Sequence, residues 1–136
     1  MEGYDMIAAD THVIIWDALK PEKLSPNAKK AIRKANAQDG IIFCEISLWE
    51  IAMLMKKGRL SVGVDYQEFI RLVSDSNKYI FIGITPQIAE LSTHLFADAN
   101  KDPADRIISA TAIVEKADLV TSDKMMRRSK KVHTIW

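Results

Sequence analysis

The stretch NKDPADRIISATA, residues 100–112, carries the features around which the rest of the chain is organised. Asp102 stands at a helix N-cap position, and Pro103 follows at the first helical position, where its missing N–H costs nothing. Asp105 falls in the first turn, and the apolar residues behind it recur at helical spacing. An acid in the first turn can act through the helix dipole alone, for about 0.3–1 kcal/mol. The stretch predicts a helix with one buried face and two carboxylates at its start.

Three other carboxylates stand in the same kind of place, near the end of an apolar run where a helix begins. Asp10 follows MIAA, Glu50 lies a turn beyond IIFCEIS, and Asp123 follows DLVTS. Each has a local interpretation as a helix cap. For Glu50 this is a capping box, because Ser47 stands three residues before it. Capping does not exclude metal binding, since a helix start is also a rigid mount for a ligand.

Short apolar runs alternate with amphipathic segments along the chain. Strands are expected at residues 6–9, 41–44, 79–84, 118–121 and 132–136, with helices between them. This alternation predicts an α/β fold, a three-layer sandwich with a central, mostly parallel sheet and helices on both faces. The 136 residues contain no linker or internal repeat, so residues 1–136 are expected to form a single domain.

Composition restricts the possible partners and setting. The net charge of +1 excludes a global basic field, so a nucleic acid would have to be held by a local patch. The single cysteine, Cys44, cannot form an internal disulfide, which favours a reduced, cytoplasmic setting. No apolar segment approaches the roughly 20 residues that a membrane-spanning helix needs. We therefore expect no membrane association.

The acids form one metal site if the fold brings their side chains close together. In a parallel sheet, functional groups gather beyond the carboxyl ends of the strands, at a switch point in strand order. Two like charges 4 Å apart repel by about 1 kcal/mol in water and about 4 kcal/mol at an effective dielectric of 20, so a cluster needs a divalent cation. Oxygen ligands without paired histidine or cysteine favour Mg²⁺ or Mn²⁺. Such an ion serves phosphodiester hydrolysis in many nucleases.

Four segments together resemble the PIN-domain family, specifically the VapC-like toxins of bacterial toxin–antitoxin pairs. They are AADTHVIIW at 8–16, SLWEIAMLMKKGRL at 47–60, KDPADRIISATA at 101–112 and LVTSD at 119–123. The resemblance implies metal-dependent endoribonuclease activity on RNA, a possible cognate antitoxin and a homodimer. It also implies that the metal-binding and catalytic acids are Asp10, Glu50, Asp105 and Asp123, with Asp102 as a further metal ligand or positioning acid.

Supporting residues are predicted around these acids. Thr11 and Ser122 adjoin acids and are expected to orient them or a water molecule, or only to cap helices. Arg106 is expected to pair with a carboxylate or to meet a phosphate. A dense basic run is a candidate RNA-binding patch, with a merely solvated surface as the alternative. This run consists of Lys124, Arg127, Arg128, Lys130 and Lys131.

Other interpretations remain open. The chain can be a non-catalytic PIN-fold interaction module whose acids only cap helices. A phosphoryl-transfer domain of the response-regulator type is disfavoured, because that class has adjacent acids near the first strand and Asp10 has no acidic neighbour. An apolar stripe of Trp49, Met53 and Met55 is expected to receive an antitoxin helix.

Overall fold

A single parallel sheet forms the centre of the chain. The computed structural model describes residues 6–96 and 102–136, so Asn100 and Lys101 of the opening stretch lie outside the described part. The strand order is β3-β2-β1-β4-β5, and every described pair of neighbours is parallel. The strands are β1 (Ile7–Ala9), β2 (Ile41–Cys44), β3 (Tyr79–Ile82), β4 (Asp118–Val120) and β5 (Thr134–Ile135). All the predicted strands are confirmed, although β3, β4 and β5 end earlier than expected.

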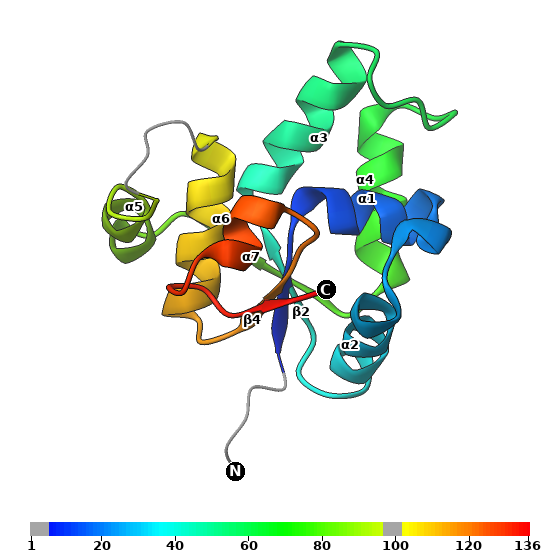
Figure 1. Cartoon of the computed structure of the whole chain (residues 1–136). Coiled ribbons are helices and arrows are strands. Elements are labelled where there is room, and N and C mark those ends of the chain that lie inside the picture. Colours follow the sequence, from blue (N-terminus) through cyan, green and yellow to red (C-terminus); the bar gives the residue numbers. More distant parts are fainter. Residues whose placement is uncertain (1–5, 97–101) are drawn as a thin grey trace.

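Helices cover both faces of this sheet (Figure 1). They are α1 (Thr11–Leu19), α2 (Pro26–Ala37), α3 (Ile46–Lys56), α4 (Tyr66–Ser76), α5 (Pro86–Ser92), α6 (Pro103–Val114) and α7 (Lys124–Arg128), with the 3-10 turn η1 (Pro21–Lys23) after α1. The side chains of Ser25, Asp65 and Thr85 accept hydrogen bonds from backbone N–H groups three residues onward. These caps explain why α2, α4 and α5 begin where they do.

The alternation of side chains along the strands divides the core into two layers. On one face, Ile7 and Phe43 pack with buried residues of α1, α2 and α4. On the other face, Ala8 and Ile42 pack with α6 and α7. Because both faces are covered, the strands read as continuous apolar runs rather than as alternating ones.

The strand order contains one switch point. From β1 the chain moves outward through β2 to β3, and then returns to place β4 on the other side of β1. The carboxyl ends of β1 and β4 therefore lie side by side with their connections diverging, the geometry that opens a crevice in such sheets. Asp10 follows β1 directly and Asp123 follows β4 after two residues.

Within residues 6–96 and 102–136, no helix is both long enough and apolar enough to cross a bilayer. Cys44 is a free, buried thiol, and burial raises its pKa to about 12. It is therefore an unreactive core residue.

Candidate metal centre

A cavity of about 330 Å³ lies at the switch point of the sheet. Its wall is acidic, and it includes every acid that was predicted to bind metal. The lining residues are Asp10, His12, Trp16, Glu50, Asp102, Asp105, Ser122 and Asp123. Acids that are more than 100 residues apart in the chain thus converge on one space.

Asp10 is the most enclosed of these acids, with only 6% of its surface exposed. One carboxylate oxygen accepts a hydrogen bond from the backbone N–H of Thr11 at 2.8 Å, and the other accepts from the Thr121 hydroxyl at 2.7 Å. Burial raises the pKa of Asp10, and the nearby charge of Asp123 raises it further, while the two hydrogen bonds act in the opposite direction. The two hydrogen bonds fix the position of the carboxylate, while burial disfavours its ionised form.

Thr121 contacts two of the cavity acids, and sequence reasoning did not predict this. It is fully buried at the end of β4, donates its hydroxyl hydrogen to Asp10 and accepts the backbone N–H of Asp123 at 3.0 Å. It therefore links two of the acids. The only sequence signal was its position between a strand and the Ser122-Asp123 cap, and nothing local indicated which side chain it would meet.

The start of α3 corrects the capping-box interpretation. The helix begins at Ile46 with Glu45 at its N-cap, so Ser47 is already inside the first turn. The Ser47 hydroxyl contacts the Thr11 hydroxyl at 2.7 Å, and the Thr11 hydroxyl donates its hydrogen to Glu50. Since Thr11 has a single hydroxyl hydrogen, Ser47 is the donor in the first contact. Ser47 and Glu50, the two residues of the predicted capping box, therefore both bond to Thr11 at the start of α1.

Glu50 consequently lines the acidic cavity and does not cap α3. Burial raises its pKa, and the charges of Asp10 and Asp102 raise it further, while the Thr11 hydrogen bond lowers it. The influence of Asp10 and Asp102 indicates that the three carboxylates share one electrostatic environment.

Replacing Thr11 by valine tests this link between α1 and α3. Valine keeps the volume but removes the donor to Glu50 and the acceptor for the buried Ser47 hydroxyl, so we expect the free energy of unfolding to fall by about 1–3 kcal/mol. Urea unfolding measures the change. Thr93→Val is the matched control, because Thr93 is exposed and, within the described residues, its hydroxyl bonds to a carbonyl of the adjoining helix α5. Equal, small effects of both changes would contradict the proposed role of Thr11.

The remaining acids are mounted on helix starts, as predicted. Asp102 accepts the backbone N–H of Ala104 at 2.8 Å and caps α6, and Asp123 accepts that of Met126 at 2.9 Å and caps α7. Asp105 is half-buried in the first turn of α6. Because Asp102, Asp105 and Asp123 also line the cavity, capping and facing the site occur together.

The donor set fits a hard divalent cation. Five carboxylates line the cavity, and the cysteine of the chain is buried in β2 outside it. In the described part of the chain, however, no three His, Cys, Asp or Glu side chains lie close enough to hold one ion between them. Repulsion between ionised carboxylates disfavours a closer approach unless a cation compensates it. The chemistry of the wall matches the expected ion, and the full ligand set remains a prediction.

Supporting residues divide into those at the cavity and those away from it. Ser122 lines the cavity. The Arg106 guanidinium donates a hydrogen bond to the backbone carbonyl of Leu95. His12 and Trp16 line the cavity without having been predicted to do so.

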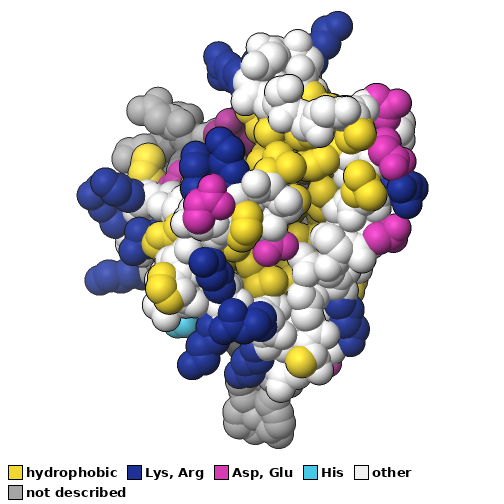
Figure 2. Space-filling model, turned by 90° about the vertical axis from the view of Figure 1, so that its right-hand side faces the viewer, with side chains coloured by type: hydrophobic (Ala, Val, Ile, Leu, Met, Phe, Trp, Pro, Cys, Tyr) yellow, Lys and Arg dark blue, Asp and Glu magenta, His cyan; other side chains and the backbone are white. Residues whose placement is uncertain are grey.

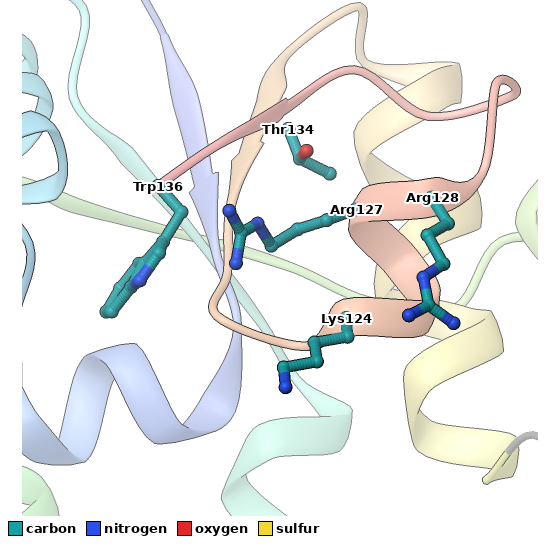
Figure 3. Close-up of a pocket in the computed structure, with 5 residues that line it drawn as sticks. All are labelled: Lys124, Arg127, Arg128, Thr134 and Trp136. Atoms are coloured by element: carbon teal, nitrogen blue, oxygen red, sulfur yellow. The ribbon is translucent and has the colours of Figure 1, made fainter.

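The basic run is divided by the structure. Lys124, Arg127 and Arg128 line a second pocket beside β5, shown in Figure 3. Lys130 is not among the residues of this pocket, and the Lys131 ammonium donates to the His94 carbonyl at 3.3 Å. Of this run, the first three cations line the pocket together.

Comparison with known proteins agrees with this architecture. The chain is 32% identical over 132 residues to Ribonuclease VapC22 of Mycobacterium tuberculosis, covering 96% of this chain and 98% of that protein. The fold is similar to that of VapBC2 from Rickettsia felis bound to a promoter DNA fragment, with a TM-score of 0.66, 18% identity and coverage of 95% and 96% of the two chains. It is also similar to a toxin-antitoxin complex from Klebsiella pneumoniae, with a TM-score of 0.62, 22% identity and coverage of 93% and 94%. The model of the PIN domain matches residues 7–132, and the chain therefore belongs to the PIN-domain family.

Proposed function

We propose that this protein is a divalent-cation-dependent endoribonuclease that hydrolyses RNA phosphodiester bonds as the toxin of a toxin–antitoxin pair. The observation that carries the proposal is the convergence of Asp10, Glu50, Asp105 and Asp123 on one cavity at the switch point. The similarity over nearly the whole chain to a protein named a ribonuclease supports it.

The ion would be Mg²⁺ or Mn²⁺, held by those four acids with Asp102 as a further ligand or positioning acid. Hard oxygen donors without a matching histidine or cysteine set prefer these ions. A bound cation of this kind supplies Lewis acidity for the attack of water on a phosphodiester. The high density of carboxylates repels an anionic strand, so an ion bound in the cavity favours the entry of the scissile phosphate.

The protein's own residues position these acids. Thr121 restrains Asp10, and Thr11 restrains Glu50 through hydroxyl hydrogen bonds. The backbone N–H groups of Thr11 and Met126 further restrain Asp10 and Asp123. Restrained ligands reduce the reorganisation needed when charge develops during the reaction.

The direct test is cleavage of a single-stranded RNA by the purified protein. We expect internal cleavage with Mg²⁺ or Mn²⁺, loss of cleavage in EDTA, and recovery when the ion is restored. Cleavage that continues unchanged in excess EDTA would contradict the metal-dependent mechanism.

A non-catalytic PIN-fold module remains the alternative, because Asp10, Asp102 and Asp123 do accept backbone N–H groups at helix starts. Glu50 and Asp105 argue against it, since Glu50 bonds to Thr11 and Asp105 lines the same cavity. The stability measurements described in the Discussion separate the two functions.

An antitoxin is the expected protein partner, and an apolar groove offers a place for it. Hydrophobic side chains gather in a hollowed area of one face of the molecule (Figure 2). Two hollows of about 570 and 220 Å³ meet at Leu19, and we call them together the apolar groove. Its apolar lining includes Trp16, Leu19, Leu54, Leu60, Val62, Val64 and Leu72. Lys20, Lys23 and Arg59 line the same groove and favour acidic residues in the partner.

The predicted stripe on α3 is less suitable as a docking surface. Trp49 is 57% exposed, but Met55 is partly buried and packs against the core layer of α1, α2 and α4. Met55 lies two residues beyond Met53, which places the two side chains on different sides of the helix. The stripe is therefore not continuous.

Replacing Leu72 by aspartate tests the apolar groove. Leu72 is 46% exposed on α4, so the change leaves the core intact while placing a charge in the docking surface. We expect at least a tenfold loss of affinity for the cognate antitoxin, measured by calorimetry, because an unpaired charge would be buried. Ile84→Asp is the matched control at a 51% exposed position outside the groove. An unchanged affinity of Leu72→Asp for the antitoxin would exclude the groove as the docking surface.

The homodimer remains a prediction that sedimentation of the purified protein checks.

A further inference from the structure

A pocket of about 550 Å³ lies between α7 and β5, outside the acidic cavity. Its lining residues are Lys124, Arg127, Arg128, Thr134 and Trp136. Figure 3 shows that Arg127 extends from α7 toward Trp136 and that Lys124 lies on the same side, whereas Arg128 extends along the other side of the helix. Two cationic side chains and one aromatic ring thus line the same pocket.

This pocket adjoins the acidic cavity through both the backbone and the side chains. Ser122 and Asp123 line the acidic cavity, and the next residue, Lys124, lines the basic pocket. The ring of Trp16, on the wall of the acidic cavity, lies with its centroid 6.0 Å from that of Trp136. The two spaces therefore lie next to each other at the carboxyl end of the sheet.

We propose that the pocket of Lys124, Arg127 and Trp136 is a nucleotide subsite that holds the RNA strand beside the bond to be cleaved. The indole of Trp136 stacks on a base, while Lys124 and Arg127 contact a backbone phosphate. The assignment rests on the proposed ribonuclease function and names the part of the protein that binds its substrate.

The electrostatics of the two spaces explain why such a subsite is needed. The acidic cavity carries five carboxylates and repels a polyanionic strand. The attraction must come from groups outside it but close enough to position the strand. Lys124, directly after Asp123 in the chain, and Arg127, one helical turn further, meet this requirement.

The combination of groups also matches a nucleotide better than a simple anion. Phosphates are bound by Lys and Arg, and exposed bases of single strands stack on aromatic side chains. The backbone of Trp136 is anchored, because its backbone oxygen accepts a hydrogen bond from the Asn27 side-chain amide at 3.1 Å. The indole is half-buried and lines the pocket, so it presents a fixed ring rather than a freely rotating one.

The test measures binding and not cleavage. A short fluorescein-labelled single-stranded RNA is titrated in EDTA, and its anisotropy gives the affinity for the parent protein and for each variant. We expect Trp136→Ala to weaken binding by about 5- to 150-fold, the range for loss of one base stack, and Trp136→Phe to retain most of the affinity. The phenylalanine variant keeps a ring against Trp16 and therefore controls for a folding defect.

Arg127→Ala tests the phosphate contact. We expect weaker binding and a less steep dependence of log affinity on log salt, by about 0.7 for one lost contact to a single strand. Arg33→Ala is the matched control, because Arg33 is an exposed arginine in the second half of α2, which leads to the start of β2 at the opposite end of the sheet. It should bind like the parent.

An oligonucleotide with abasic positions distinguishes stacking from charge. We expect Arg127→Ala still to weaken its binding, whereas Trp136→Ala should have no further effect. Parent-like RNA binding by both Trp136→Ala and Arg127→Ala would overturn the subsite, as would equal effects of Trp136→Ala on normal and abasic strands. Because EDTA prevents metal-dependent cleavage, loss of the subsite and loss of the ribonuclease function are separate outcomes. RNA that binds through these residues in EDTA but is not cleaved when Mg²⁺ or Mn²⁺ is supplied would refute only the ribonuclease function.

Discussion

Asp10→Asn is expected to lower kcat/KM for RNA cleavage by about 100- to 1,000-fold, the loss typical of removing one preorganised electrostatic group. Asparagine has nearly the same shape and keeps an oxygen for the Thr11 backbone N–H. It removes the negative charge that a divalent ion would bind. The same direction is expected for Asp105→Asn and Glu50→Gln, which change the acids contributed by α6 and α3. Initial rates with a fluorogenic RNA at saturating Mn²⁺ measure the effect.

Asp65→Asn provides a matched control for these variants. Asp65 is an exposed N-cap that accepts the backbone N–H of Glu68 at 2.9 Å, and it does not line the acidic cavity. Asparagine caps a helix about as well as aspartate, so neither cleavage nor stability should change appreciably. If purified Asp10→Asn and Asp105→Asn both retained the parent's metal-dependent activity, the catalytic assignment of the cavity would be wrong.

The second large effect concerns how the charges of the acids contribute to the free energy of unfolding. Without the cation they destabilise the folded state, and with the cation bound they stabilise it. Burial raises the pKa values of Asp10 and Glu50, and neighbouring carboxylates raise them further. A raised pKa means that the folded state binds more protons than the unfolded state, so the free energy of unfolding decreases as the pH rises. The stabilisation is complete at pH values below the unfolded pKa, near pH 4, and is lost as the pH passes through the folded pKa.

Neutralising either acid should therefore raise the melting temperature in EDTA near neutral pH by a few degrees. The parent should in turn gain about 2.7 kcal/mol when Mn²⁺ is present at 100 times its Kd, and Asp10→Asn should gain much less. Thermal and urea unfolding with and without Mn²⁺ measure both effects. If the acids only cap helices, Asp10→Ala should instead lower stability by about 1 kcal/mol, and Mn²⁺ should not distinguish it from the parent.

Much of the fold could be predicted because its causes are local. The run IIFC is too short and too apolar for anything but a buried strand, and the structure places it as β2. Ser25-Pro26, Thr85-Pro86 and Asp102-Pro103 each combine a capping side chain with a proline at the first helical position, and each begins a helix. Such choices depend on backbone N–H groups within a few residues, which the sequence contains.

Errors occurred where a local pattern competed with a distant contact. Ser47 and Glu50 have the spacing of a capping box, yet both hydroxyl and carboxylate contacts go to Thr11 on another helix. Thr121 had no local indication of its role, because its partner Asp10 lies 111 residues away. Trp136 gained a potential role only when β5 brought it beside Arg127.

The amino-acid sequence by itself determined the alternation of strands and helices and the placement of Asp10, Asp102, Asp105 and Asp123 at helix starts, because these depend on hydrophobic periodicity and on short-range capping. Only the tertiary structure decided that β1 lies between β2 and β4 and that the acids face a common cavity. It also decided that a basic, aromatic pocket adjoins them. Strand order and side-chain convergence depend on the packing of whole layers, and no pattern within a few residues specifies them.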